Sequence, residues 1–140
     1  MKKPVIINLG VAILIVVLAG GCQSSGLTDE KLINTTMTDW KAALTAQDLD
    51  RLMATYSDNY VSDRASGKDS VQERMTRIFE QGWMDNVNVN LEGAAITIDG
   101  DKAEFGPVEF TSDEGLFKRQ FTLQKESGTW LLVGSKGQER

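Results

Sequence analysis

Residues 93–110 read GAAITIDGDKAEFGPVEF, and this stretch decides the fold. Apolar and polar residues alternate with a period of two on both sides of Asp99-Gly100, which predicts two strands joined by a two-residue hairpin turn. The apolar phase slips by one residue near Gly93 and again near Gly106. A turn at Asp99-Gly100 sets these two glycines opposite each other, and paired slips at glycine predict a bulged, sharply bent sheet.

Helical spacing dominates the chain before this sheet. Apolar residues recur every three or four positions after Thr28, which predicts a helix that begins at this N-cap and runs to about residue 46. Asp48 is expected to cap a second, short helix, and residues 60–62 are expected to form a short strand. A third helix is expected over 68–81. A bent sheet wraps other elements, and these helices are the candidates.

Two further strands are expected after the bent hairpin. Alternation over residues 116–124 gives an inner face, and residues 129–135 are apolar on both sides. The sequence therefore predicts one α+β domain, a cone in which three N-terminal helices are wrapped by a strongly bent, mainly antiparallel sheet. The outer face of this sheet is polar and lacks the apolar centre of an obligate interface, so we expect a monomer or a weak homodimer.

The N-terminal segment has the composition of a secretory signal. Lys2 and Lys3 precede fourteen residues, 5–18, of which thirteen are apolar or glycine, and small residues follow up to Cys22. The apolar run is shorter than the roughly 20 residues that span a bilayer. The alternative is an uncleaved anchor helix with an incidental cysteine.

Because it ends at a cysteine, this segment resembles a bacterial lipoprotein signal, although Ala19 stands where the lipobox usually has leucine. The resemblance implies a signal peptide over 1–21, a lipidated Cys22 and a tether over 22–27. It also implies a lipid anchor in the bacterial cell envelope, since several acyl chains hold a protein stably in a membrane. Gln23, in place of aspartate, implies the outer membrane, facing the periplasm, if the source is Gram-negative.

Composition disfavours several classes of function. The chain of 140 residues has no histidine, a single cysteine and a formal net charge of −5. Without histidine it lacks the commonest general base and the commonest transition-metal ligand, so we expect no metal and no cofactor. The Asp99-Gly100-Asp101 stretch is interpreted as a turn rather than a calcium loop. An acidic domain binds nucleic acid poorly, and no nucleic-acid partner is expected.

Four segments that mark a helix junction and two turns carry a resemblance to a known fold family: WKAALTAQDLDRL (40–52), YSDNY (56–60), IDGDKA (98–103) and KESGTW (125–130). They are similar to the nuclear transport factor 2-like superfamily, which includes SnoaL-like and ketosteroid-isomerase-like proteins. The resemblance implies a cystatin-like α+β cone over 28–135, with a tail over 136–140. It also implies a pocket for an apolar small molecule at the mouth of the cone, while the chemistry stays open because this fold hosts many functions.

The isomerase branch suggests a partial catalytic set. Asp63 matches the position of a carboxylate that acts there as a base, and Trp40 stands where that branch has a carbonyl-polarising tyrosine. A second donor from the sheet is not identifiable. Asp63 is therefore either a general base whose pKa an apolar pocket raises, or a solvated loop acid beside Arg64.

The candidate pocket residues are Trp40, Tyr56, Tyr60, Asp63, Trp83 and Arg119. The aromatic residues either line a pocket or fill the core. Arg119 interrupts an apolar inner face, so it either binds a ligand carboxylate at the cone mouth or covers the core with its stem while its head reaches water.

We expect a membrane-anchored lipoprotein whose function is to bind a small apolar or amphipathic ligand, or an envelope protein, without catalysis. The alternative is a cofactor-free isomerase, dehydratase or cyclase that uses Asp63 as its base.

The anchor can be tested at Cys22. We expect Cys22→Ser to release the protein from membranes or to leave an unprocessed precursor, because the thiol that accepts the lipid is gone. Fractionation and intact mass measure both results. Processing after residue 21 with continued membrane association would contradict the lipoprotein interpretation.

Overall fold

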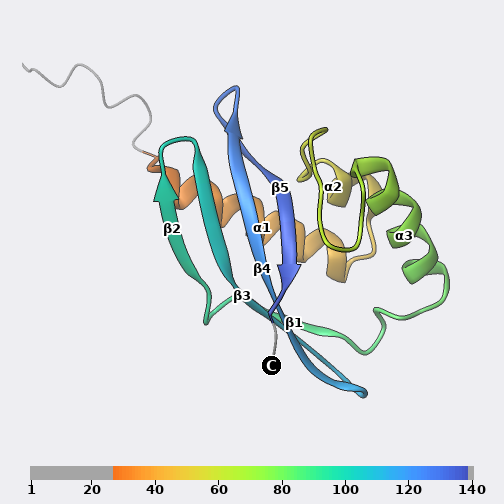
Figure 1. Cartoon of the computed structure of the whole chain (residues 1–140). Coiled ribbons are helices and arrows are strands. Elements are labelled where there is room, and N and C mark those ends of the chain that lie inside the picture. Colours follow the sequence, from red (N-terminus) through yellow and green to blue (C-terminus); the bar gives the residue numbers. More distant parts are fainter. Residues whose placement is uncertain (1–26, 139–140) are drawn as a thin grey trace, which may run out of the picture.

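The computed structural model describes residues 27–138, which form three helices and five strands (Figure 1). In chain order these elements are α1 (Asp29–Thr45), α2 (Leu49–Met53), α3 (Lys68–Glu80), β1 (Asn88–Asn90), β2 (Ala95–Asp99), β3 (Lys102–Ser112), β4 (Gly115–Glu126) and β5 (Thr129–Gly137). The expected signal peptide, Cys22 and residues 139–140 lie outside the described residues. None of the described helices is both long and apolar enough to cross a membrane.

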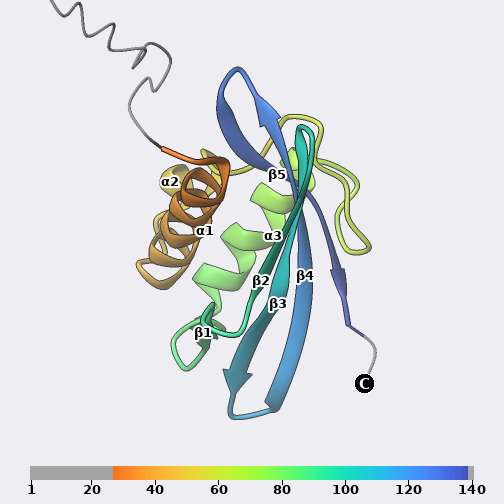
Figure 2. The same ribbon diagram turned by 90° about the vertical axis from the view of Figure 1, so that its left-hand side faces the viewer.

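The strands form one antiparallel sheet that the helices cover on one side. The strand order is β1-β3-β4-β5, and β2 pairs with another part of β3. Figure 2 shows α1 and α3 on the same side of the sheet. This arrangement confirms the predicted α+β fold, with three helices followed by an antiparallel sheet.

Two of the three described helices, α1 and α2, begin where the sequence offers a side-chain cap, whereas α3 begins after Gly67 without one. The Thr28 hydroxyl accepts a hydrogen bond from the Lys31 N–H at 3.3 Å, and the Asp48 carboxylate accepts one from the Arg51 N–H at 3.1 Å. Each bond satisfies an N–H that has no partner within the first helical turn. Along α1 the buried side chains recur every three or four residues, so a single stripe of the helix faces the sheet.

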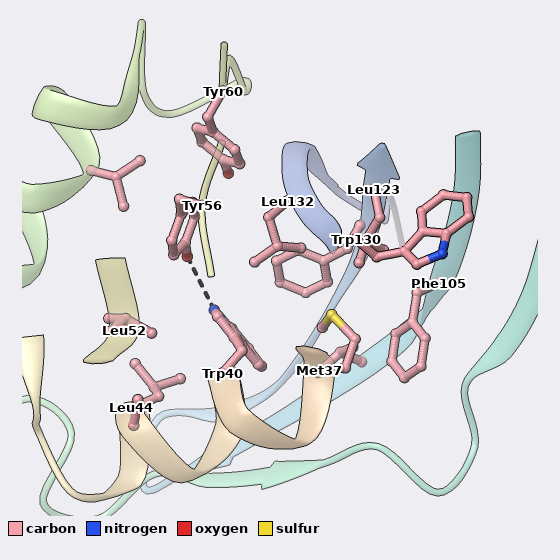
Figure 3. Close-up of a cluster of buried hydrophobic side chains, with 14 of the residues drawn as sticks. Met37, Trp40, Leu44, Leu52, Tyr56, Tyr60, Phe105, Leu123, Trp130 and Leu132 are labelled. Carbon is pink, nitrogen blue, oxygen red and sulfur yellow. Dashed lines mark hydrogen bonds between the residues drawn. The ribbon is translucent and has the colours of Figure 1, made fainter. Parts of the chain in front are cut away.

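The core lies between this stripe and the inner face of the sheet (Figure 3). Trp130 and Phe105 are the largest side chains that are fully buried, and Ile33 and Met37 of α1 are buried with them. Every core residue, side-chain cap and strand pairing of the described domain lies between residues 28 and 137. Within the described residues, the segment 28–137 therefore contains the core, the side-chain caps and the strand pairings of the fold.

The predicted bend is present in β3, but the predicted hairpin register is wrong. Gly106 lies opposite Ala95 and not opposite Gly93. The closing pair is Asp99 with Lys102, so the turn residues are Gly100 and Asp101. Gly100 has φ +59°, and glycine is therefore needed at the first turn position, where the prediction had placed Asp99.

Gly106 makes the bend possible. The pairing of β3 with β4 is regular up to Phe105 opposite Phe121 and resumes at Val108 opposite Arg119, so β3 has one extra residue in a bulge. Gly106 has φ +154°, a conformation that is favourable only for glycine, and a Cβ atom there would lie 2.5 Å from Gln120 Oε1.

The predicted strand over 60–62 is not formed. The Ser57 and Val61 N–H groups donate to the carbonyls of Leu132 and Val133 in β5, at 2.8 and 3.1 Å, which ties the segment to the sheet edge. The Ser62 N–H bonds to the Ala65 carbonyl instead, so the chain turns before a ladder can form. At the other end, β5 continues to Gly137, two residues beyond the expected limit of the domain.

Substitution of Gly106 tests the bend. We expect Gly106→Ala to lower the free energy of unfolding by about 1–3 kcal/mol, because alanine is unfavourable at this φ and the Gln120 side chain would also have to move. Gly93→Ala is the control, since a methyl group added at Gly93 would meet no atom within 4 Å beyond its chain neighbours. Urea unfolding followed by intrinsic fluorescence measures both variants, and equal effects would show that the bend does not depend on glycine.

Candidate functional site

A cavity of about 580 Å³ lies between α1, α3 and the far end of the hairpin formed by β3 and β4. Its volume is within the range of small-molecule sites, about 300–1,000 Å³. The apolar part of the lining comes from all three of these elements: Trp40, Leu44, Val71, Met75, Ile78, Phe110, Phe117 and Phe121. Hydroxyl and guanidinium groups complete one side: Tyr56, Tyr60, Ser62, Arg64, Arg74, Arg119 and Ser135.

Five of the six candidate residues chosen from the sequence line this cavity, namely Trp40, Tyr56, Tyr60, Trp83 and Arg119. Trp83 follows α3 and is 66% exposed, so it lies at the rim, whereas Trp40 and the two tyrosines are buried. Asp63 is not among the lining residues of the cavity in the described part of the chain. The structure therefore brings together the aromatic candidates and Arg119, and it leaves the candidate base outside.

Trp40 and Tyr56 form a buried polar pair at the inner end of the cavity (Figure 3). The indole Nε1–H of Trp40 donates to the Tyr56 hydroxyl at 3.1 Å, while its ring packs edge-on against Phe110 and Phe121. Burial raises the pKa of Tyr56, so its hydroxyl stays protonated at neutral pH. Among residues 27–138 this hydroxyl has no acceptor for its own proton, which is therefore free for a ligand.

A second chain of hydrogen bonds runs from Tyr60 to Asp63. The Tyr60 and Ser135 hydroxyls are 2.8 Å apart, and Arg119 Nη2 donates to Ser135 Oγ at 2.9 Å and also to Asp63. Arg119 is only 8% exposed, so its head does not reach into water as one of the two interpretations required. This series of hydrogen bonds fixes the guanidinium of Arg119 at the wall of the cavity.

Asp63 is held as a carboxylate by its partners. The hydrogen bond from Arg119, together with a second one from the Gly137 N–H at 3.1 Å, lowers the pKa of Asp63 below its ordinary value. Its side chain is 44% exposed. Asp63 is an exposed loop residue, as the second interpretation from the sequence expected, but its carboxylate pairs with Arg119 and not with Arg64. The raised pKa of the first interpretation is not found, because these partners lower the pKa of Asp63.

Sequence reasoning missed Arg64, Arg74 and Ser135 as lining residues. A signal for Arg74 was present, because this residue lies three positions after Val71 and four before Ile78 on the face of α3 that carries the apolar stripe. A charged residue within such a stripe indicates a face that is not packed into a core. Arg64 and Ser135 had no comparable signal.

The described residues contain no group of three or more Asp, Glu, His or Cys side chains that could hold a metal ion. The lining of the cavity is instead rich in hydrogen-bond donors over an apolar floor. Such a site can hold a ligand that has a large apolar part and an acceptor group at one end.

No family model matches the chain, and no curated protein matches it. Solved structures do show its fold. A protein of unknown function with a cystatin-like fold from Nostoc punctiforme is 16% identical, with a TM-score of 0.64, over 78% of this chain and 89% of that one. A nuclear transport factor 2-like protein of unknown function from Pseudomonas putida is also 16% identical, with a TM-score of 0.63, over 77% and 84%.

Another nuclear transport factor 2-like protein of unknown function, from Shewanella oneidensis, is 12% identical, with a TM-score of 0.64, over 80% of this chain and all of that one. At these identities the similarity establishes the nuclear transport factor 2-like, cystatin-like fold and carries no function with it.

The ion pair of Asp63 predicts a pH-dependent loss of stability. The pKa of Asp63 is lower in the folded state than in the unfolded state. The ion pair therefore contributes to the free energy of unfolding above the unfolded-state pKa of about 4, and this contribution is lost as the pH falls through the folded-state pKa. We expect Asp63→Asn to reduce the free energy of unfolding at neutral pH, because the buried Arg119 loses its counter-charge. The expected reduction is only about 1–2 kcal/mol, because Asp63 is half-exposed and solvent weakens the ion pair.

The measurement is urea unfolding of both proteins at neutral and at acidic pH, where the difference should shrink. Asp58→Asn is the matched control, because Asp58 pairs with Lys68 from a side chain that is 92% exposed. Equal stability of Asp63→Asn and wild type at neutral pH, or a more stable variant, would contradict this account.

Proposed function

We propose that this domain binds a small amphipathic molecule in the cavity and does not catalyse a reaction on it. The observation that carries the proposal is the cavity itself, with an apolar floor between α1, α3 and the sheet and donor groups on one side. Half-buried side chains of α3, such as Met75 and Ile78, face this space. A ligand that covers them gains the free energy of apolar burial.

The position of Asp63 speaks against the isomerase-like alternative. A general base must reach the proton that it removes, and its pKa should lie near the working pH. Asp63 is outside the lining, is bound by Arg119 and has a lowered pKa. A partner protein as the occupant is less well supported, because the apolar floor lies in a concave site rather than on a flat surface.

The proposal includes a location that rests on the sequence. Lys2, Lys3, the apolar run and Cys22 support a lipid anchor in the bacterial cell envelope, and these residues lie outside the described part of the chain. The polar outer face of the sheet supports a monomer or a weak homodimer, which stays a prediction.

Binding of a neutral probe tests the cavity. N-phenyl-1-naphthylamine is apolar and uncharged and fluoresces in apolar sites, and we expect saturable binding to residues 27–140. Met75→Trp, which fills the cavity from α3, should weaken this binding by about tenfold or more, because the enlarged side chain takes the space of the probe.

Gln72→Trp is the control for this experiment. Gln72 is exposed on α3 and is not among the residues that line the cavity, so the same enlargement should leave binding unchanged. Thermal unfolding confirms that both variants are folded. Absence of saturable binding by the wild-type domain, or equal binding by both variants, would refute the proposal.

A further inference from the structure

Three arginines from separate parts of the chain line the same cavity. Arg64 belongs to the loop after α2, Arg74 to α3 and Arg119 to β4. Arg64 is exposed, Arg74 is half-buried and Arg119 is buried, so the guanidinium groups run from the mouth toward the interior. The fold places these charges together although the chain as a whole is acidic.

The positive charge of this cluster is only partly balanced. Asp63 is the ion-pair partner of Arg119, and in the described part of the chain neither Arg64 nor Arg74 forms an ion pair. The Nη1 atom of Arg119 is also buried and has no hydrogen-bond partner among residues 27–138. A buried cationic donor without an acceptor is costly unless another group supplies one.

The arginines are close enough to act on one another. Burial lowers the pKa of Arg74, and the charges of Arg64 and Arg119 lower it further. Asp113 and Glu114 also line the cavity, from the exposed turn between β3 and β4. Like charges held together at a cavity wall attract an anion and repel a cation.

From this arrangement we infer that the ligand of the cavity is an anionic amphiphile, whose oxyanion head is bound by Arg64, Arg74 and Arg119 and whose apolar body lies along α3 and the sheet. This inference rests on the proposed function, because it names the class of ligand for the same cavity. Guanidinium groups suit such a head, since their planar donors match carboxylate, phosphate or sulfonate oxygens two at a time. The free proton of Tyr56 supplies a further donor deeper in the site.

Two probes with the same ring system test the contribution of the anionic head separately from that of the apolar body. 1-Anilinonaphthalene-8-sulfonate carries a sulfonate on the skeleton of the neutral N-phenyl-1-naphthylamine. We expect the wild-type domain to bind the sulfonate about tenfold more tightly than the neutral probe, with a preference that narrows as salt is raised. Titrations use residues 27–140 in solution and the full chain in phosphatidylcholine nanodiscs, with the signal of empty discs subtracted.

Arg74→Gln is the decisive variant, because Arg74 is half-buried and makes no ion pair that its loss would break. It should weaken binding of the sulfonate by about tenfold and weaken binding of the neutral probe far less, because only the sulfonate loses a charged partner. Arg77→Gln is the matched control on the exposed outer face of α3, with the same change of charge, and should affect neither probe. Arg74→Lys keeps the charge and should recover part of the affinity.

The outcomes separate this inference from the proposed function. If both probes bind equally and Arg74→Gln changes neither, the inference is wrong and the cavity proposal stands. If neither probe binds, the cavity proposal itself is wrong. Decanoate should displace the sulfonate probe. Binding of the domain only to phosphatidylglycerol vesicles, lost in Arg74→Gln, would instead assign the arginines to a membrane surface and overturn the inference.

Discussion

The bend of β3 at Gly106 is the constraint on which the rest of the structure depends. On one side of the bulge, Phe105 belongs to the same buried cluster as Ile33 and Met37 of α1. On the other side, Phe110, Phe117 and Arg119 face the cavity together with α3. The same hairpin therefore contributes side chains both to the hydrophobic core and to the lining of the cavity. A hairpin without the bulge could not contribute to both the core and the cavity lining.

The space persists because α3 does not pack as α1 does. Six residues of α1 are buried, whereas α3 has a single buried residue, Val71. Met75 and Ile78 are half-buried and line the cavity, and Phe79 is half-buried against the core. Since a helix gains most of its stability from tertiary packing of its apolar face, α3 is the helix with the most to gain from a ligand. The helix that is least buried, α3, is thus also one wall of the candidate site.

Local signals in the sequence predict the elements well and their long-range partners poorly. The caps Thr28 and Asp48 and the apolar periodicity locate the starts of the helices and the ends of α1 and α3 to within a residue, because both effects act within one or two turns. The hairpin register failed because Gly100 belongs to two overlapping candidate turns, and only the fold decides which one forms. The pairing of Asp63 with Arg119 spans 56 residues, and no local pattern encodes such a contact.

The kinds of polar group around the cavity decide between holding a ligand and transforming it. Tyr56 stays protonated, and the guanidinium groups of Arg64, Arg74 and Arg119 carry N–H donors and no acceptor, so these groups all donate hydrogen bonds. The carboxylates on the lining, Asp113 and Glu114, lie on the exposed turn between β3 and β4. Donors at one end of an apolar cavity orient an acceptor-bearing molecule, but proton abstraction also needs an acceptor of suitable pKa near the ligand. Asp63 is withdrawn from that role by the same arginine that completes the donor set, which favours binding over catalysis at this site.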